Sequence, residues 1–367
     1  MIKWLLGGCI ALVVAAAGVI GVRMATYPAG PAFSTPWDLA EAPPVDAERA
    51  AQSLARAIQI PTISTEPGVV SDPDAFAALR LHLAQTYPRV HAAMTREIVA
   101  GHSLLFTLAG SDPTLAPMVF LAHQDVVPVE AGSEDQWPHP PFSGAIADGA
   151  VWGRGAMDDK GSLIALMEAM EALLATGFSP RRTIIFAFGH DEEVSGAGAA
   201  AMAALLQERN IRAWFVLDEG SATVEDFPLT GAPVALIGIA EKGYMTVRVT
   251  ATGEGGHSSM PPQDTAAERL AQAILALRGR PFPGGAREAP VSDMLQALYP
   301  ALGPGPQAAI ANQWALGGVL DQQMSATAAG NALMRTTIAP TVLGGGTKEN
   351  VLPQEVYAIV NLRLHPR

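Results

Sequence analysis

The sequence predicts an α/β protein with two domains, in which a mostly parallel β-sheet between helices is followed by a smaller α+β domain. In residues 45–240, short apolar runs alternate with helical patterns, as in consecutive β-α-β units. In residues 241–367, the pattern changes to alternating strands and an amphipathic helix. A length of 367 residues with 49% hydrophobic content is sufficient for two cores.

The lengths of the apolar runs predict the elements of the first domain. Residues 118–122, 183–189 and 213–218 are short enough to be buried strands, whereas 161–177 and 196–210 have helical patterns. Crossover helices cover both faces of a parallel sheet, so its strands are apolar on both sides. We therefore expect a mostly parallel sheet with helices on both faces.

The sequence patterns that predict secondary structure are weaker in the second domain than in the first. Residues 245–253 and 356–366 alternate in the manner of half-exposed strands, and 265–279 form an amphipathic helix. Residues 280–330 are predicted only as mixed helix and loop. Helices are expected to cover one face of this sheet.

The N-terminal segment is apolar. The run Trp4–Val22 contains no charged residue and is flanked by Lys3 and Arg23. Its length is enough to span a bilayer, so residues 1–26 are predicted to be a transmembrane anchor or a signal segment. The protein is therefore expected to be membrane-anchored or exported, in a periplasmic or other extracytoplasmic location.

Two other interpretations of this segment remain open. The small residues Ala15–Ala17 could form the cleavage site of a signal peptide, and Cys9 could belong to a lipoprotein signal. The lipoprotein interpretation is disfavoured because little apolar sequence precedes Cys9. Residues 27–44 are rich in proline, alanine and glycine and are predicted to be a linker.

Charge and cysteine content argue against a nucleic-acid-binding protein and against cysteine-based sites. A net charge of −12 disfavours a nucleic-acid surface, which requires a concentrated basic face. Cys9 is the only cysteine, so the folded domains contain neither a disulfide nor a thiolate metal site. Any metal must be bound by His, Asp and Glu.

Acidic or histidine side chains follow each of the three predicted strands of the first domain. Ligands of an open parallel sheet bind outside the carboxyl ends of its strands, so these side chains are expected to converge on one crevice. A fourth source is the glycine-rich run 153–162, just before the 161–177 helix. The candidates are His123 and Asp125 after the first strand, Glu192 and Glu193 after the second, Asp218 and Glu219 after the third, and Asp158 and Asp159 in the glycine-rich run.

These residue types are the ligands of a hydrolytic zinc site, and their number suggests two metals that share a bridging carboxylate. One carboxylate must stay free to accept a proton from the attacking water, and Glu192 or Glu193 could do so. Taken singly, Asp158 could be a helix cap and His123 a hydrogen-bonded core histidine. The coincidence of four clusters favours the metal site.

The chain resembles the di-zinc metallopeptidase family that contains carboxypeptidase S, aminoacylase and acetylornithine deacetylase. Within it, the chain looks most like the branch of carboxypeptidase S and the N-fatty-acyl-amino-acid synthase/hydrolases. The similarity covers most of the chain from about residue 50. The matching segments are "AHQDVVPV", "WPHPPFSGAIADGAVWGRGAMDDKGS", "GHDEEVSGAGA", "LDEG", "EKGYMTVRVTATGEGGHSSMP" and "TKENVLPQEVYAIVNLRLHPR".

The resemblance implies two Zn²⁺ ions and a role for each catalytic-domain residue. His123 and Asp218 would bind one zinc and Glu193 the other. Asp158 would bridge them, with a cis peptide before Asp159. Asp125 would orient His123, and Glu192 would be the general base.

The resemblance also implies that residues 241–367 form an inserted lid and dimerisation domain. His257 would reach the substrate carbonyl, in dimeric relatives across the subunit interface. Asn350 and Arg363 would hold the substrate carboxylate. A homodimer is therefore possible.

One departure concerns the C-terminal part of the catalytic domain, which is expected to be absent. In the family, the chain returns to the catalytic domain after the lid and supplies a further zinc-binding histidine. This chain ends at Arg367 on the last predicted strand of the lid. The chain alone is therefore expected to be poorly folded or weakly active.

These expectations lead to one leading hypothesis for the function and one competing hypothesis. The leading hypothesis is a zinc-dependent hydrolase, either a carboxypeptidase or an N-acyl-amino-acid amidohydrolase, that cleaves an amide next to a free carboxylate. The rival is a truncated, non-catalytic relative that binds metal or peptide without turnover. A serine hydrolase is disfavoured because the sequence has no G-x-S-x-G motif.

Overall fold

The computed structural model describes residues 2–28, 43–227 and 229–366, with side chains of the first helix from Ala11 onward. The chain divides into two compact units, Asp38–Gly220 and a second unit formed by Met1–Trp37 with Ser221–Arg367. Each unit is described separately. The domain boundary expected at residue 240 stays a prediction.

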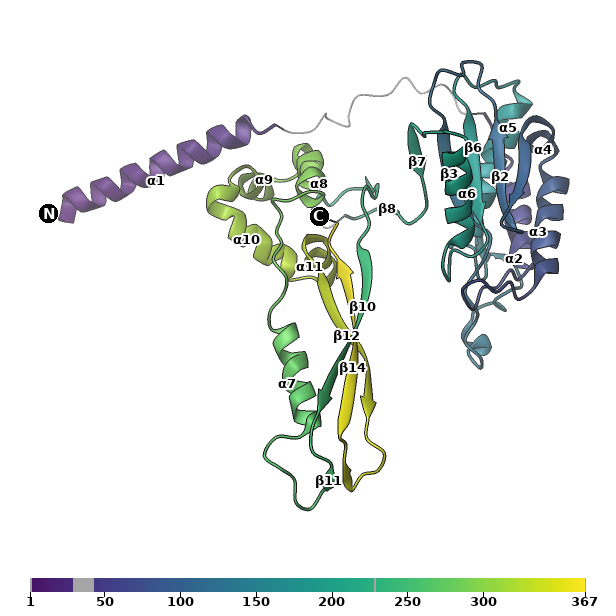
Figure 1. Ribbon diagram of the computed structural model, residues 1–367. Coiled ribbons are helices and arrows are strands. Elements are labelled where there is room, and N and C mark those ends of the chain that lie inside the picture. The colour runs from purple at the N-terminus through teal and green to yellow at the C-terminus, as the bar shows by residue number, and fades with distance from the viewer. Residues whose placement is uncertain (1, 29–42, 228, 367) are drawn as a thin grey trace. The chain divides into compact units, whose positions relative to one another are not determined.

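The unit Asp38–Gly220 is built on a five-stranded mixed sheet (Figure 1). β3, β6 and β7 are parallel, as predicted, and β2 runs opposite to β6 and β1. The hairpin of β1 and β2 was not predicted. In spatial order the strands are β1 (Thr95–Val99), β2 (Ser103–Leu108), β6 (Ile184–Gly189), β3 (Met118–His123) and β7 (Phe215–Leu217).

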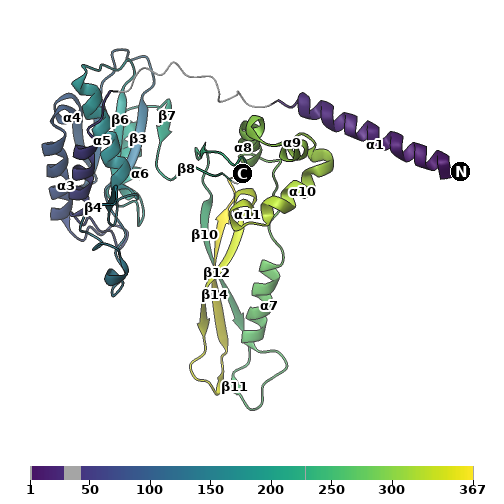
Figure 2. The same cartoon turned by 180° about the vertical axis from the view of Figure 1, so that it is seen from behind.

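Helices cover both faces of this sheet, as expected (Figures 1 and 2). On one face, buried side chains such as Phe106 and Phe186 pack against four helices, and on the other Met202 of α6 packs against Ile185. The first face carries α2 (Ala47–Ile58), α3 (Pro73–Thr86), α4 (Pro88–Ala93) and α5 (Lys160–Ala175), and the second carries α6 (Ala197–Glu208). A short helix η1 (Glu134–Gln136) and a hairpin of β4 (Ala145–Ala147) and β5 (Ala150–Trp152) lie between β3 and α5 in the chain.

A buried carboxylate on α5 stabilises the start of α4. Glu171 is 2% exposed and accepts hydrogen bonds from the backbone N–H groups of Arg89 at 3.2 Å and Val90 at 3.0 Å, with a further bond from the Arg89 guanidinium. We expect Glu171→Ala to lower the free energy of unfolding by about 2 kcal/mol, because two helix N–H groups lose their partner. Chemical denaturation measures this, and Glu208→Ala at an exposed position is the control. Equal midpoints for the two variants would contradict the expectation.

Three half-buried histidines are expected to make the stability of this unit sensitive to acid. Burial lowers the pKa of His82, His91 and His102. Below the ordinary pKa near 6.5 the unfolded chain binds protons that the folded unit does not, so stability falls as the pH decreases, by up to about 1.4 kcal/mol per pH unit for each proton. We expect the urea midpoint to fall between pH 7.5 and 5.5, and to fall less in His82→Gln. An identical pH dependence in the variant would rule out a contribution of His82.

The second unit contains a three-stranded antiparallel sheet in the order β10-β14-β12. One face of β14, with Val356, Ala358 and Val360, packs on α7. Strands at 245–253 and 356–366 and the helix at 265–279 were predicted, and β12 was not. The elements are β10 (Gly243–Thr252), α7 (Ala266–Arg278), β12 (Thr337–Gly345) and β14 (Glu355–Leu364), with short pairs of β8 (Thr223–Val224) with β9 (Val234–Ala235) and β11 (Gly256–His257) with β13 (Val351–Leu352).

A helical layer completes this unit. Region 280–330, predicted only as mixed helix and loop, contains most of it. Its core includes Tyr299 and Leu320, and Met24 of α1 and Tyr27 just after α1 pack against it. The helices are α1 (Ile2–Ala25), α8 (Val291–Leu298), η2 (Tyr299–Ala301), α9 (Pro304–Ala311), α10 (Gln313–Ser325) and α11 (Ala328–Met334).

The N-terminal segment forms a helix, but its predicted role is not confirmed. Within the described ranges, no helix is both long enough and apolar enough to cross a membrane. The larger part of the linker predicted at 27–44 lies outside the described residues.

Candidate metal centre

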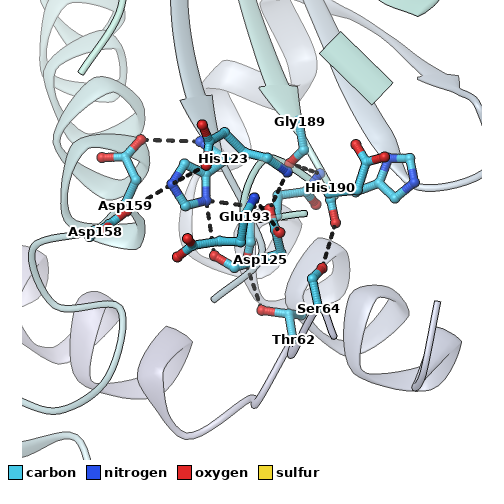
Figure 3. Close-up of polar contacts among 12 residues, drawn as sticks. Thr62, Ser64, His123, Asp125, Asp158, Asp159, Gly189, His190 and Glu193 are labelled. Carbon is cyan, nitrogen blue, oxygen red and sulfur yellow. Dashed lines mark hydrogen bonds and ion pairs between the residues drawn. The ribbon is translucent and has the colours of Figure 1, made fainter. Parts of the chain in front are cut away.

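The candidate residues of the first unit lie at one edge of its sheet, as the parallel pairing of β3, β6 and β7 requires. His123 is the last residue of β3. Glu192 and Glu193 follow β6, and Glu219 follows β7. Figure 3 shows His123 surrounded by acidic side chains from separate segments of the chain.

The tightest cluster consists of His123, Asp158 and Glu219. One potential ligand atom of each lies within 4.8 Å of the others. His123 Nε2 is 2.9 Å from Asp158 Oδ1 and 3.5 Å from Glu219 Oε1. The sequence analysis placed acidic residues from four segments at this point, and the structure brings Asp158 and Glu219 closest to the imidazole.

Asp218 takes a different position from its neighbour Glu219. Its Oδ1 accepts the backbone N–H of Glu219 at 2.9 Å, and it lines a small cavity with His123 and Glu192. The sequence identified both residues at the end of β7, but strand placement alone does not tell which of two neighbours points inward. The role of Asp218 as a metal ligand stays a prediction, and Glu219 is an additional candidate.

Asp125 fixes the orientation of His123. The imidazole is 2% exposed, and its Nδ1–H donates to the backbone oxygen of Asp125 at 2.9 Å with Asp125 Oδ1 at 3.3 Å. Nε2 therefore points toward Asp158. Burial favours the neutral ring, but the hydrogen bond and charge of Asp125 and the charge of Glu219 outweigh it and raise the pKa of His123 to about 10.

The Asp125 carboxylate also holds the loop after β6. It is fully buried and accepts the backbone N–H groups of Glu192 at 3.1 Å and Glu193 at 3.2 Å. Burial alone would raise the pKa of Asp125, but hydrogen bonds, first of all with His123, lower it below its usual range. One ionised carboxylate thus positions both the histidine and the loop with the two glutamates.

The consecutive residues Asp191, Glu192 and Glu193 have different environments. Asp191 accepts the N–H groups of Ala197 and Gly198 at 3.0 and 2.8 Å and so anchors the start of α6. Glu193 Oε1 accepts the N–H of Val127 at 3.3 Å, whereas Glu192 Oε2 lies 4.0 Å from His123 Nε2. Burial raises the pKa of Glu192 and Glu193. Only two of the three carboxylates are therefore available to the site.

The peptide between Asp158 and Asp159 is cis, as the resemblance implied. Asp159 is buried, and its Oδ2 accepts the backbone N–H of His123 at 3.1 Å. It occupies the N-cap position of α5 without a side-chain capping bond. Asp158 is paired with His123, so the simpler interpretation of Asp158 as a helix cap is not supported.

The donor set fits a divalent metal ion. It contains one imidazole nitrogen and several carboxylate oxygens, which are the ligands of hydrolytic zinc sites. Among the described residues, the ion pairs found for Asp158, Glu192 and Glu219 are all with His123. The negative charge thus exceeds the positive charge that the protein supplies, which a bound cation would balance.

The predicted substrate-binding residues lie in the other unit. His257 is exposed on β11, and its Nδ1 accepts the N–H of Ser259 at 3.2 Å, which leaves the proton on Nε2. Asn350 precedes β13, and its Oδ1 is buried without a hydrogen-bond partner. Since β11 pairs with β13, these two residues are neighbours in the fold.

Arg363 is not brought together with them. It lies near the far end of β14, where it pairs with Tyr244 and its guanidinium lies 4.7 Å from that ring's centre. The eight residue-to-residue steps from Glu355 to Arg363 correspond to roughly 26 Å along an extended strand. A shared substrate contact of Arg363 with His257 in one chain is therefore not supported by this unit's fold.

Comparison with known proteins places these features in a family context. Residues 119–315 match the model of peptidase family M20/M25/M40. The chain is 39% identical over 318 residues to human N-fatty-acyl-amino acid synthase/hydrolase PM20D1, covering 86% of this chain and 62% of that protein. It is 34% identical over 360 residues to carboxypeptidase S of Saccharomyces cerevisiae, covering 92% of this chain and 61% of that protein. The chain thus spans less than two thirds of these relatives.

The fold is also found among solved structures. An M20 family metallo-carboxypeptidase from Sulfolobus solfataricus matches with a TM-score of 0.55 and 20% identity, covering 87% of this chain and 71% of that one. At this identity the match bears on the fold alone. It supports the mixed α/β architecture.

Proposed function

Because the chain belongs to peptidase family M20/M25/M40, we propose that the protein is a zinc-dependent hydrolase that cleaves an amide bond next to a free carboxylate. The observation that carries the proposal is the cluster of His123, Asp158 and Glu219 beside the loop that carries Glu192. Its substrates would be peptides, cleaved at the C-terminal residue, or N-acyl amino acids. The names of the human and yeast relatives support these two classes.

The proposed cofactor is a pair of Zn²⁺ ions. His123, Asp158, Glu193 and Asp218 would hold them, and Glu219 is a further candidate because of its distance to His123. Bound zinc would polarise the substrate carbonyl and lower the pKa of the attacking water. Asp125 would keep the Nε2 lone pair of His123 directed at the metal, since its hydrogen bond fixes the proton on Nδ1.

Glu192 is proposed as the general base. Its carboxylate is near His123 Nε2, and its backbone is held by Asp125. The raised pKa of Glu192 suits a group that accepts a proton from water and then passes it to the leaving amine. Glu193, whose side chain is held by the N–H of Val127, is better placed as a ligand.

His257 and Asn350 are proposed to bind the substrate. The Nε2–H of His257 can donate to a carbonyl oxygen that becomes negatively charged, and Asn350 adds a polar side chain beside it. Arg363 would bind the carboxylate of a substrate. It lies toward the opposite end of β14 from these two residues.

We further propose that the protein is exported. A narrower proposal is that the N-terminal segment also anchors it to the membrane. The uncharged run Trp4–Val22 supports this proposal. Fractionation of cells followed by N-terminal sequencing would test both forms. A homodimer formed through the second unit is a separate proposal, which sedimentation analysis would test.

The first experiment on the function is zinc analysis with an amide hydrolysis assay on the same purified sample. In the complete protein we expect about two zinc ions per chain and turnover of N-acyl amino acids or C-terminal dipeptides. Zinc binding without turnover of either substrate class would favour a non-catalytic binding protein. A protein without zinc and without turnover would refute the proposal.

A further inference from the structure

A segment with alternate residues buried lies next to the candidate metal centre. It consists of Ile60–Ser64, which follows α2 and pairs with the chain just after β3. Val126 N donates to the Thr62 oxygen at 3.0 Å, and Ser64 N donates to the Val126 oxygen at 3.1 Å. Thr62 is 0% and Ser64 4% exposed. We call this segment the strap.

Thr62 holds the peptide groups on both sides of Asp125. Its hydroxyl donates to the backbone oxygen of Gln124 at 2.6 Å, and its own backbone oxygen accepts the N–H of Val126. Figure 3 shows Thr62 below Asp125 in this position. The backbone that carries the Asp125 carboxylate is therefore fixed from both directions.

Ser64 connects the strap to the loop after β6. Its hydroxyl donates to the backbone oxygen of His190 at 3.5 Å. The strap thus contacts the backbone beside Asp125 through Thr62, and through Ser64 the loop whose N–H groups bind the Asp125 carboxylate.

Lys160 ties the strap to the loop of Asp158. Its fully buried ammonium group donates to the backbone oxygens of Ala57 at 2.9 Å and Ile60 at 2.6 Å. These oxygens belong to the end of α2 and the start of the strap. Lys160 is the first residue of α5, so it connects the strap to the turn that presents Asp158.

We propose that the strap, through Thr62 and Ser64 and with Lys160 as its anchor, is a positioning element that sets the Asp125 carboxylate and thereby the direction of His123. None of these three side chains is proposed to touch metal or substrate. A network that orients a metal-bound histidine typically changes metal affinity or activity by about 10- to 100-fold when it is broken. This inference rests on the proposed function.

The central test compares Thr62→Val with Thr62→Ser in the full protein. Valine retains the shape of threonine but lacks the hydroxyl, whereas serine restores it. Ser53→Ala is the matched control, because Ser53 is a buried hydroxyl of α2 that receives the Tyr87 hydroxyl away from the centre. Zinc affinity by competition with a chromophoric chelator, kcat, KM and the unfolding temperature are measured for each variant.

We expect Thr62→Val to weaken zinc binding and lower kcat by about 10-fold or more with little change in KM, and Thr62→Ser to recover both. Ser53→Ala should lower the unfolding temperature without changing zinc affinity. The inference is overturned if Thr62→Val only lowers the unfolding temperature, as Ser53→Ala does. A wild-type protein that binds no zinc would refute the proposed function itself, whereas normal wild-type binding with an unaffected Thr62→Val would refute only the positioning role.

Discussion

Replacing Glu192 with glutamine should lower kcat by about a thousand-fold while zinc content stays at the wild-type level. Glutamine has the size of glutamate but cannot accept a proton from water. The carboxylate of Glu192 lies near His123. The backbone N–H of residue 192 donates to Asp125, and this bond does not depend on the side chain that is replaced. The variant should therefore fold and bind metal normally. Steady-state kinetics on an N-acyl amino acid and elemental analysis of the same sample measure both effects.

The neighbouring glutamate provides the matched control. Glu193→Gln removes the same charge one residue away, on a side chain held by Val127. If Glu193 is a ligand, this variant loses zinc as well as turnover, whereas Glu192→Gln loses turnover alone. A Glu192→Gln variant with nearly normal kcat would refute the general-base assignment. Zinc loss in Glu192→Gln but not in Glu193→Gln would show that the two roles are exchanged.

Sequence reasoning found the position of the site because parallel strands end at one edge. The apolar runs that end before His123, Glu192 and Asp218 were identified as strands, and β3, β6 and β7 confirm them. The hairpin β1–β2 was missed. Its first strand has exposed and half-buried positions and therefore lacks the continuous apolar run that identified the others.

The choice between adjacent acidic residues could not be made from the sequence. Glu219 rather than Asp218 is closest to His123, and Asp191 anchors α6 instead of facing the site. Both outcomes depend on backbone direction within a turn, which composition and spacing do not encode. The strap was also missed, because Thr62 and Ser64 act through backbone groups and have no motif of their own.

Asp158→Ala should lower the zinc content by at least one ion per chain and abolish turnover while leaving the metal-free fold intact. Its side chain is 67% exposed and pairs with His123, so its loss removes little buried structure. As the proposed bridge between two ions it would affect both, and at least one zinc per chain should be lost. Elemental analysis, turnover and thermal unfolding after chelation test this, with exposed Asp135→Ala as the control.

The unfolding measurement separates the two interpretations of Asp158. If Asp158 were a helix cap, its removal would lower the metal-free stability of the unit by about 1 kcal/mol, and zinc content would be unaffected. If it is a metal ligand, metal-free stability stays unchanged or rises, because one of several crowded carboxylates has been removed. Zinc should then stabilise the wild type more than the variant, since the wild type gains more binding free energy in the folded state. Equal stabilisation of both proteins by zinc would exclude Asp158 from the metal centre.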